Sequence, residues 1–512
     1  MRRTTTLTAA GLLGLALLAP TTSATAAAET CRGEAATIVG TGPTITGTDA
    51  RDVIVTGSAI SVSTRGSDDV ICVRGGTAAA DFVNVDAGWD NDVVDTTAMG
   101  GVDRLSVVLG AGTDTFIGGA ANETVVAGPD PRTGLDDSGA DTVRTGEGDD
   151  QVTTGAVGGS SGSGANADVA DLGPGDDQLT LLSWWTTPEA LLTGGEGDDT
   201  LVTDMSGTRN EVVVNLTTGR LAATHGNPDV YEGDGLVSSF EAADVSISDQ
   251  WVYYTGLAGD DSLTVHVDPS CCALPGLEVT SLAGDDEVMI DNTMIDAVSR
   301  IDTGEGDDRL VAARSNGFLD LDLKLERLVT SDPQNLGGGG VPRGFPTVVG
   351  VENAFLMAPQ VSMVGDNGDN DLLANGCTST LDGRHGDDYL SQVGGDPWFD
   401  TYTFDCAASA EMYGGPGKDR LRGGQGNDRL DGEGDADRIE GRGGNDRIRG
   451  AGGSDTMDGG DGRDDVRGQR GSDLLRGNED GDTLLGGPGH DKADGSAGRD
   501  RCVAERERRC ER

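Results

Sequence analysis

The stretch that decides the fold runs from residue 414 to residue 503 and consists of ten consecutive nine-residue units: GGPGKDRLR, GGQGNDRLD, GEGDADRIE, GRGGNDRIR, GAGGSDTMD, GGDGRDDVR, GQRGSDLLR, GNEDGDTLL, GGPGHDKAD and GSAGRDRCV. The first position is Gly and the sixth is Asp in all ten units, and the eighth position is apolar throughout. A fixed period of this kind indicates a repeat architecture, in which each unit adds the same piece of structure.

The spelling of each unit predicts a turn followed by a short strand. Glycines among the first six positions permit the positive φ angles that tight turns need. The last three residues place an apolar side chain between two polar ones, which is the pattern of a minimal strand with its middle residue pointing inward. Two units then complete one turn of a right-handed coil, and successive coils stack in parallel about 4.8 Å apart. We therefore predict an all-β parallel β-roll.

This coil brings the sixth-position aspartates into two files, because equivalent turns are eighteen residues apart. One file contains Asp419, Asp437, Asp455, Asp473 and Asp491, and the other contains Asp428, Asp446, Asp464, Asp482 and Asp500. Ca²⁺ takes six to eight oxygen ligands, which glycine carbonyls and one carboxylate from each of two stacked turns can supply. Five turns per file leave four gaps, so the block is expected to hold up to about eight calcium ions.

The units resemble the hemolysin-type (RTX) calcium-binding nonapeptide, whose consensus is Gly-Gly-x-Gly-x-Asp-x-U-x with U apolar. The resemblance implies a β-roll that holds calcium through the sixth-position Asp side chains and the backbone carbonyls of the turn, here the ten aspartates above. It also implies a bacterial source. Two units depart from the consensus at position four, where Asp435 and Asp480 replace Gly, and position eight weakens to Ala493 and Cys502 in the last two units.

A looser form of the pattern extends across much of residues 47–391. Residues 194–202 match every defining position, which makes Asp199 a further, less certain calcium ligand. Gly-Asp-Asp cores begin at Gly148, Gly175, Gly197, Gly259, Gly284, Gly306 and Gly386. Their spacing of 22 to 27 residues within each run suits the rungs of a parallel β-helix with variable loops. Whether these upstream cores bind calcium stays open.

Four segments are therefore expected. Residues 1–28 have the layout of a secretory signal peptide, with Arg2 and Arg3, an apolar stretch and small residues before the cleavage site. Residues 29–410 form a degenerate, acidic β-helix-like repeat region with loop insertions, 411–503 form the calcium-binding β-roll, and 504–512 form a disulfide-capped tail. General secretion is the default route, with the twin-arginine route as the alternative, and either delivers the protein outside the cell.

Charge and cysteine content agree with export. A net charge of −51 excludes nucleic-acid binding through phosphates and makes cations the natural partners. No second apolar run approaches the ~20 residues of a membrane span.

Eight cysteines in an exported chain predict disulfides, and proximity in the sequence favours three pairs while leaving an adjacent pair unassigned. The pairs are Cys31 with Cys72, Cys377 with Cys406 and Cys502 with Cys510, and the unassigned residues are Cys271 and Cys272.

No catalytic motif accompanies the repeats, so a non-catalytic, calcium-binding role is predicted. The four histidines stand singly, outside any His-Glu-x-x-His motif, and the Gly-x-Ser-x-Gly at residues 158–162 lies in a Gly/Ser run without the strand and helix that a nucleophile elbow requires. Two alternatives stay open. One is a polysaccharide lyase or hydrolase that uses clustered Asp and aromatics such as Trp184, Trp251 and Tyr402. The other is an adhesive or matrix protein, which would leave no chemical motif.

Overall fold

The computed structural model describes residues 29–511 apart from 75–81, 100–104, 130–138, 156–166, 183–186, 205–210, 225–230, 249, 269–274, 293–294, 297, 332–344, 395–401, 403 and 405. The expected signal peptide, Cys271, Cys272, Trp184 and the Gly-x-Ser-x-Gly sequence lie outside the described residues.

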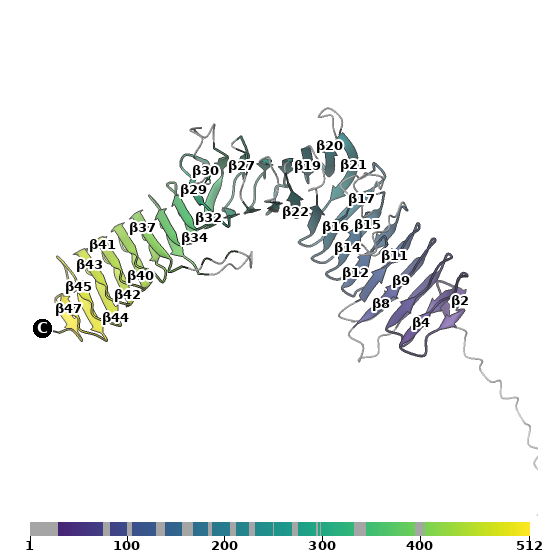
Figure 1. Ribbon diagram of the computed structural model, residues 1–512, viewed down its shortest axis with the longest axis horizontal. Helices are drawn as coiled ribbons and strands as arrows, with labels where there is room; N and C mark the ends of the chain where they lie inside the picture. Colours follow the sequence, from purple (N-terminus) through teal and green to yellow (C-terminus); the bar gives the residue numbers. More distant parts are fainter. Residues whose placement is uncertain are drawn as a thin grey trace, which may run out of the picture.

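The described chain contains strands and no α-helix, and it winds into a long, bowed solenoid (Figure 1). Two parallel sheets run along its length and face each other across the core. Sheet I consists, in order, of β4 (Thr44–Thr46), β6 (Ser61–Ser63), β8 (Val83–Asp86), β10 (Leu105–Val108), β12 (Glu123–Val126), β14 (Gln151–Thr154), β16 (Gln178–Leu181), β18 (Thr200–Asp204), β22 (Ala242–Ile247), β24 (Ser262–Val267), β26 (Glu287–Asp291), β28 (Asp308–Ala313), β32 (Val351–Met357), β34 (Asp371–Asn375), β36 (Tyr389–Gln392), β38 (Arg420–Arg422), β40 (Arg438–Gly443), β42 (Thr456–Asp461), β44 (Leu474–Asn478), β46 (Lys492–Ser496) and β48 (Arg506–Arg508).

Sheet II alternates with sheet I along the chain. It consists, in spatial order, of β3 (Ile38–Val39), β5 (Val53–Val55), β7 (Val70–Arg74), β9 (Val93–Ala98), β11 (Thr115–Ile117), β13 (Thr142–Arg144), β15 (Val169–Pro174), β17 (Leu191–Glu196), β21 (Tyr231–Ser238), β20 (Arg220–Thr224), β19 (Glu211–Asn215), β23 (Trp251–Thr255), β25 (Gly276–Thr280), β27 (Arg300–Asp302), β31 (Thr347–Val349), β30 (Arg327–Ser331), β29 (Phe318–Asp322), β33 (Gln360–Val364), β35 (Thr378–Asp382), β37 (Ser409–Pro416), β39 (Arg429–Gly434), β41 (Arg447–Gly453), β43 (Asp465–Gly471), β45 (Thr483–Leu485) and β47 (Arg501–Val503).

The register of the C-terminal strands confirms the predicted coil of two units. Leu421 pairs with Ile439, and Ile439 pairs with Met457, so each step along sheet I is eighteen residues. Upstream the step varies, from 27 residues between Val152 and Leu179 to 22 between Leu179 and Leu201. Irregular rungs therefore precede a regular roll, and both sheets continue through residue 410 without a break.

The core is a narrow apolar column between the sheets. The eighth residue of each unit points into it, as predicted, and Leu421, Leu430 and Ile439 are 0–1% exposed. One continuous cluster of buried side chains extends from Ile45 to Ala493. Since each nonapeptide adds a single inward apolar side chain, burial gives little stabilisation per residue against the entropy of ordering the chain. The regular roll therefore needs a further source of stability.

Two antiparallel insertions interrupt sheet II near the bend of the solenoid (Figure 1). Strand β20 pairs antiparallel with both β21 and β19, and these two neighbours pair parallel with β17 and β23 respectively. The strands β31, β30 and β29 repeat the arrangement between β27 and β33. Sheet I passes both places without an insertion.

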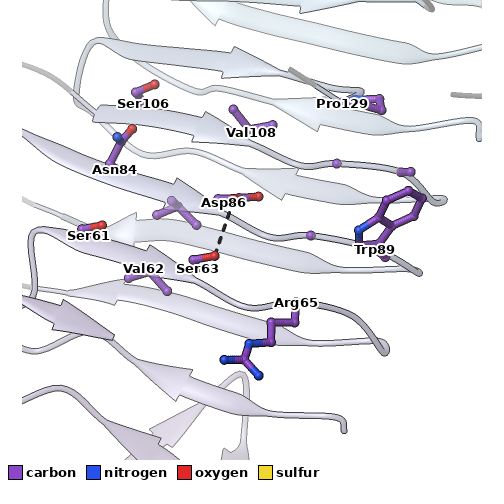
Figure 2. Close-up of a pocket in the computed structure, with 14 residues that line it drawn as sticks. Ser61, Val62, Ser63, Arg65, Asn84, Asp86, Trp89, Ser106, Val108 and Pro129 are labelled. Atoms are coloured by element: carbon purple, nitrogen blue, oxygen red, sulfur yellow. Dashed lines mark hydrogen bonds between the residues drawn. The ribbon is translucent and has the colours of Figure 1, made fainter. Parts of the chain in front are cut away.

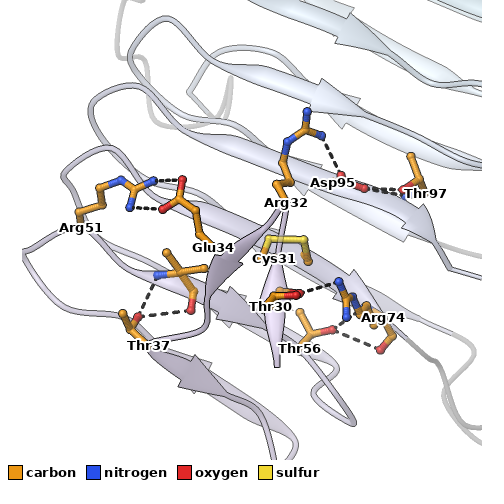
Figure 3. Close-up of a disulfide and its surroundings, with 12 residues drawn as sticks. Thr30, Cys31, Arg32, Glu34, Thr37, Arg51, Thr56, Arg74, Asp95 and Thr97 are labelled. Carbon is orange, nitrogen blue, oxygen red and sulfur yellow. Dashed lines mark hydrogen bonds and ion pairs between the residues drawn. A yellow bond between two sulfur atoms is a disulfide. The ribbon is translucent and has the colours of Figure 1, made fainter. Parts of the chain in front are cut away.

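Disulfides fasten both ends of the solenoid. At the N-terminal end the antiparallel pair β1 (Thr30–Cys31) and β2 (Glu34–Ala35) is joined to β7 through Cys31 and Cys72 (Figure 3). Cys502 and Cys510 close the C-terminal rung, and Cys377 binds Cys406. All three predicted pairings are confirmed. Within the described part of the chain, no helix has the length and apolar character needed to cross a membrane.

Candidate metal centres along the turn edges

The ten sixth-position aspartates lie where a turn enters a strand. The file that starts with Asp419 precedes strands β38 to β46 of sheet I, and the file that starts with Asp428 precedes β39 to β47 of sheet II. All ten carboxyl-bearing residues are buried, with 1–3% of their surface exposed. Two files of buried carboxylates therefore flank the core, in the arrangement that the repeat predicted.

One oxygen of each carboxylate ties neighbouring rungs together. Oδ1 of Asp437 accepts a hydrogen bond from the backbone N–H of Asp419 at 3.0 Å, and Oδ1 of Asp455 accepts one from Asp437 at 2.9 Å. The second file repeats the contact, with Asp446 accepting from Asp428 at 2.8 Å. Each aspartate thereby satisfies a turn amide of the preceding rung.

The other carboxylate oxygen has no hydrogen-bond donor in nine of the ten aspartates. Oδ2 is buried without a partner in Asp419, Asp437, Asp446, Asp455, Asp464, Asp473, Asp482, Asp491 and Asp500. In the tenth, Asp428, Oδ2 accepts from the backbone N–H of Gly424 at 2.6 Å. Burying a polar atom without a partner costs free energy, so a repeated set of such oxygens fits residues that bind a cation.

Glycine at position one gives this oxygen its space. A Cβ at Gly441 would collide with Asp446 Oδ2 and with the backbone carbonyl oxygen of Gly459 in the next rung. The same pair of oxygens surrounds Gly459, where the neighbours are Asp464 Oδ2 and the carbonyl of Gly477. Where no backbone N–H reaches the carboxylate oxygen, a cation or a proton between these two acceptors would bind both of them.

Burial makes these carboxyls hold protons more strongly when no cation is present. It raises the pKa of Asp437 and of Asp446 to about 8, and neighbouring aspartates of the same file add to the shift. The pKa of Asp419 and of Asp482 rises to about 7 for the same reasons. Near neutral pH, a cation and a proton therefore compete for the same oxygens.

The donor set suits calcium better than a transition metal. Within the described residues, no group of three or more His, Cys, Asp and Glu side chains gathers to hold a metal. An ion in these turns would take one or two carboxylate oxygens and complete its shell with backbone carbonyls. Calcium accepts such an all-oxygen set, whereas zinc prefers His and Cys.

The acidic file of sheet I extends far beyond the regular block. Asp199 belongs to it, since its Oδ1 accepts from the N–H of Asp177 at 2.9 Å and its Oδ2 is buried without a partner. The second Asp of every Gly-Asp-Asp core lies in this file. Its upstream members, each at or next to the start of a strand, are Glu123, Asp150, Asp177, Asp199, Glu241, Asp261, Asp286, Asp308, Glu352, Asn370 and Asp388.

A second upstream file, in sheet II, was missed by the sequence reasoning. Its members are Asp52, Asp69, Asp92, Asp114, Asp141 and Asp168, linked by the same bonds from amide to carboxylate. Their turns lack the full glycine pattern. The remaining signal is Asp followed two residues later by an apolar residue, as in Asp92-Val93-Val94. This file ends at Asp168, before the antiparallel insertions, and resumes at Asp428.

Of the aromatic residues considered for polysaccharide cleavage, the two in the described part of the chain, Trp251 and Tyr402, do not share a site. Trp251 stacks on Tyr253 in sheet II, with ring centroids 6.1 Å apart. Tyr402 is buried against Val311 and Phe355 of sheet I, and its hydroxyl bonds to Asp291.

A solenoid with files of buried carboxylates at its turns defines a cation-binding repeat protein. The comparison with protein families agrees, since a model of the RTX calcium-binding nonapeptide repeat matches residues 106–130, 135–156, 191–204, 413–448, 440–475 and 476–506. The chain is thus a protein with RTX calcium-binding repeats, as its sequence predicted, and the matches include the region of Asp199. No curated protein matches it.

Proposed function

We propose that the protein acts outside the cell as a non-catalytic calcium-binding rod whose turns bind the ions. The ligands are the ten sixth-position aspartates, Asp199 and carbonyl oxygens of the stacked turns. The observation that carries the proposal is the buried Oδ2 atom without a donor, repeated from rung to rung. A Ca²⁺ ion beside each pair of turns would satisfy these atoms and offset the repulsion within each file.

Calcium then has a structural role. Each ion would join the turns of two successive rungs, and the regular block would hold up to about eight ions between its turns. Because the core of this block is thin, metal binding would supply the missing folding free energy. The block would stay largely unfolded where calcium is scarce and would fold after export, at the ~10⁻⁴ to 10⁻³ M calcium that extracellular sites are tuned to.

The test is a calcium titration of the full secreted chain, followed by far-ultraviolet circular dichroism and by calorimetric counting of bound ions. The wild-type chain should gain β-structure and bind several ions. Replacing Asp446 and Asp455 together with Ala should reduce the number of bound ions. The matched control replaces Asp458 and Asp465, two acids of the same block outside the two files, and should leave the count unchanged. A chain that is fully folded and indifferent to calcium would refute the proposal.

A further inference from the structure

A groove lies on the outer face of sheet I at the N-terminal end of the solenoid, far from the regular roll (Figures 1 and 2). Strands β6, β8 and β10 form its floor, and its volume is about 680 Å³. We propose that this groove binds a neutral oligosaccharide. The proposal does not rest on calcium binding, because no carboxylate of the two files lines the groove, although Trp89 and Ala111 lie in the turns that lead to Asp92 and Asp114.

Trp89 forms one side of the groove and is unusually open to solvent. Its exposed fraction is 57%, compared with 46% for Phe82 and 38% for Phe345. In the neighbouring rungs, Gly66 approaches it on one side and Ala111 pairs with it on the other, so the indole has only small neighbours there. An exposed indole ring offers an apolar face and an N–H donor, which together suit the C–H face and the hydroxyls of a sugar.

Glycines keep the floor beside Trp89 free of side chains. Gly88 and Gly110 have φ angles of +102° and +103°, which other residues rarely adopt. A Cβ at Gly110 would also collide with the carbonyl oxygen of Gly88. The depression next to the indole is therefore fixed by the backbone, as a binding site needs.

Two columns of side chains line the rest of the floor, and all of them are polar except Val108 (Figure 2). Asn84 pairs in register with Ser61 and with Ser106, which gives one column of hydrogen-bonding groups across three rungs. In the second column, Ser63 donates to Asp86 at 3.5 Å. Successive rungs are about 4.8 Å apart, so the columns offer donors and acceptors at intervals suited to successive sugar units.

Charge selects the class of sugar. The lining contains one cation, Arg65, and one anion, Asp86. Arg65 is also 3.7 Å from Asp49, which partly neutralises it. A polyanionic glycan would therefore find no net positive charge, whereas a neutral hexose chain would meet aromatic, hydroxyl, amide and carboxylate groups in balance.

The test measures binding of three hexasaccharides to the calcium-loaded full chain by titration calorimetry: cellohexaose, chitohexaose and, as the acidic counterpart, hexagalacturonate. At least one neutral hexamer should bind, and hexagalacturonate should bind more weakly. Trp89→Ala should weaken the binding by about tenfold or more, since aromatic anchors carry a large share of binding free energy. Trp89→Tyr should retain most of the affinity, and Trp251→Ala, a change in sheet II, should retain all of it.

An unchanged calcium count in every variant would show that the rod is intact. The proposal is overturned if neither neutral hexamer binds, if hexagalacturonate binds in preference to both, or if Trp89→Ala binds as tightly as the wild-type chain.

Discussion

A single residue of the file, Asn370, indicates what the aspartates lack. Like the aspartates, Asn370 takes part in the hydrogen bonds from backbone amide to carboxylate that link the file, since its backbone N–H donates to Asp388 Oδ1 at 2.9 Å. Unlike them, it has an amide group, whose Nδ2 donates to the carbonyl oxygen of Glu352 at 2.9 Å. Its Oδ1 takes the place of the aspartate Oδ2 atoms, beside Gly365 and the carbonyl oxygen of Gly383, and accepts a hydrogen bond from the backbone N–H of Asp366 at 3.0 Å. Both polar atoms of Asn370 thus have partners, whereas Oδ2 of an aspartate without such a donor is left for a cation or a proton to bind.

Replacing Asp446 with Asn tests this difference. We expect Asp446→Asn to bind fewer calcium ions than the wild-type chain, because one carboxylate is lost, yet to be more stable than the wild-type chain in a chelator at pH 8. The gain should be roughly 1–3 kcal/mol, the usual penalty of a buried polar group without a partner. Thermal melts with and without calcium measure both effects. Equal ion counts in the two proteins would contradict the prediction.

His266 in sheet I lies in a cluster of charged side chains. The ring lies 3.3 Å from Asp244 and 3.3 Å from Asp291, and hydrogen bonds to these carboxylates raise the pKa of His266 to about 10. Asp291 also accepts the hydroxyl of Tyr402, so the cluster fastens the segment around Cys406 to the sheet.

The cluster predicts a loss of stability at alkaline pH. The folded pKa of His266 lies above the ordinary value of 6.5, so its contribution is complete below pH 6.5 and disappears as the pH rises through about 10. His266→Gln should therefore lower the melting temperature at pH 7 and have less effect near pH 10.5. The exposed turn residue His385 supplies the control. A melting temperature of His266→Gln that falls with pH as steeply as that of the wild-type chain would argue against the cluster.

At the scale of elements, the period of the repeat determined most of what could be predicted. In the regular block, Gly at position one predicted the turns, Asp at position six predicted the two files, and the apolar residue at position eight predicted the inward side chains. The antiparallel strands β20 and β30 could not be predicted, because each is a short β-prone stretch whose partner depends on long-range pairing. Asp92 and Asp114 were missed for a local reason, since their turns keep the aspartate without the full glycine pattern.

The two files of buried aspartates predict that the stability of the calcium-free roll falls as the pH rises. Burial raises the pKa of Asp419, Asp437 and Asp446 to about 7, 8 and 8 from an ordinary 3.8. For carboxyls whose folded pKa is raised, stability is present at acid pH and is lost as the pH rises through these values. In a chelator, the roll should thus hold more β-structure at pH 5 than at pH 8, by circular dichroism. Adding calcium at pH 8 should restore it. Greater stability of the calcium-free chain at pH 8 than at pH 5 would contradict this prediction.

At the scale of the whole molecule, the acidic file of sheet I runs along most of the rod, from Glu123 to Glu505, whose side chain accepts a hydrogen bond from the backbone N–H of Asp491. The file of sheet II is interrupted between Asp168 and Asp428, where the antiparallel insertions and the bend occur. If cations bind wherever a buried carboxylate oxygen lacks a donor, calcium extends well upstream of the regular block along one edge of the solenoid. The acidic N-terminal region would then be part of the calcium-stabilised rod rather than a solubilising surface.

Upstream binding can be separated from binding by the roll. The double substitution of Asp177 and Asp199 with Asn removes two buried carboxylates of the upstream file, and substitution of the exposed Asp171 and Asp198 removes the same charge without touching either file. We expect the first variant to bind fewer calcium ions than the wild-type chain, and the second to bind as many, when bound metal is counted by atomic emission after gel filtration. Small-angle scattering should show that only the first variant is less rigid at saturating calcium. Equal calcium counts in the two variants would contradict calcium binding by Asp177 and Asp199. The upstream carboxyl groups would then be protonated and would only stabilise the turns, because a proton would bind the Oδ2 atoms that we propose bind calcium in the roll.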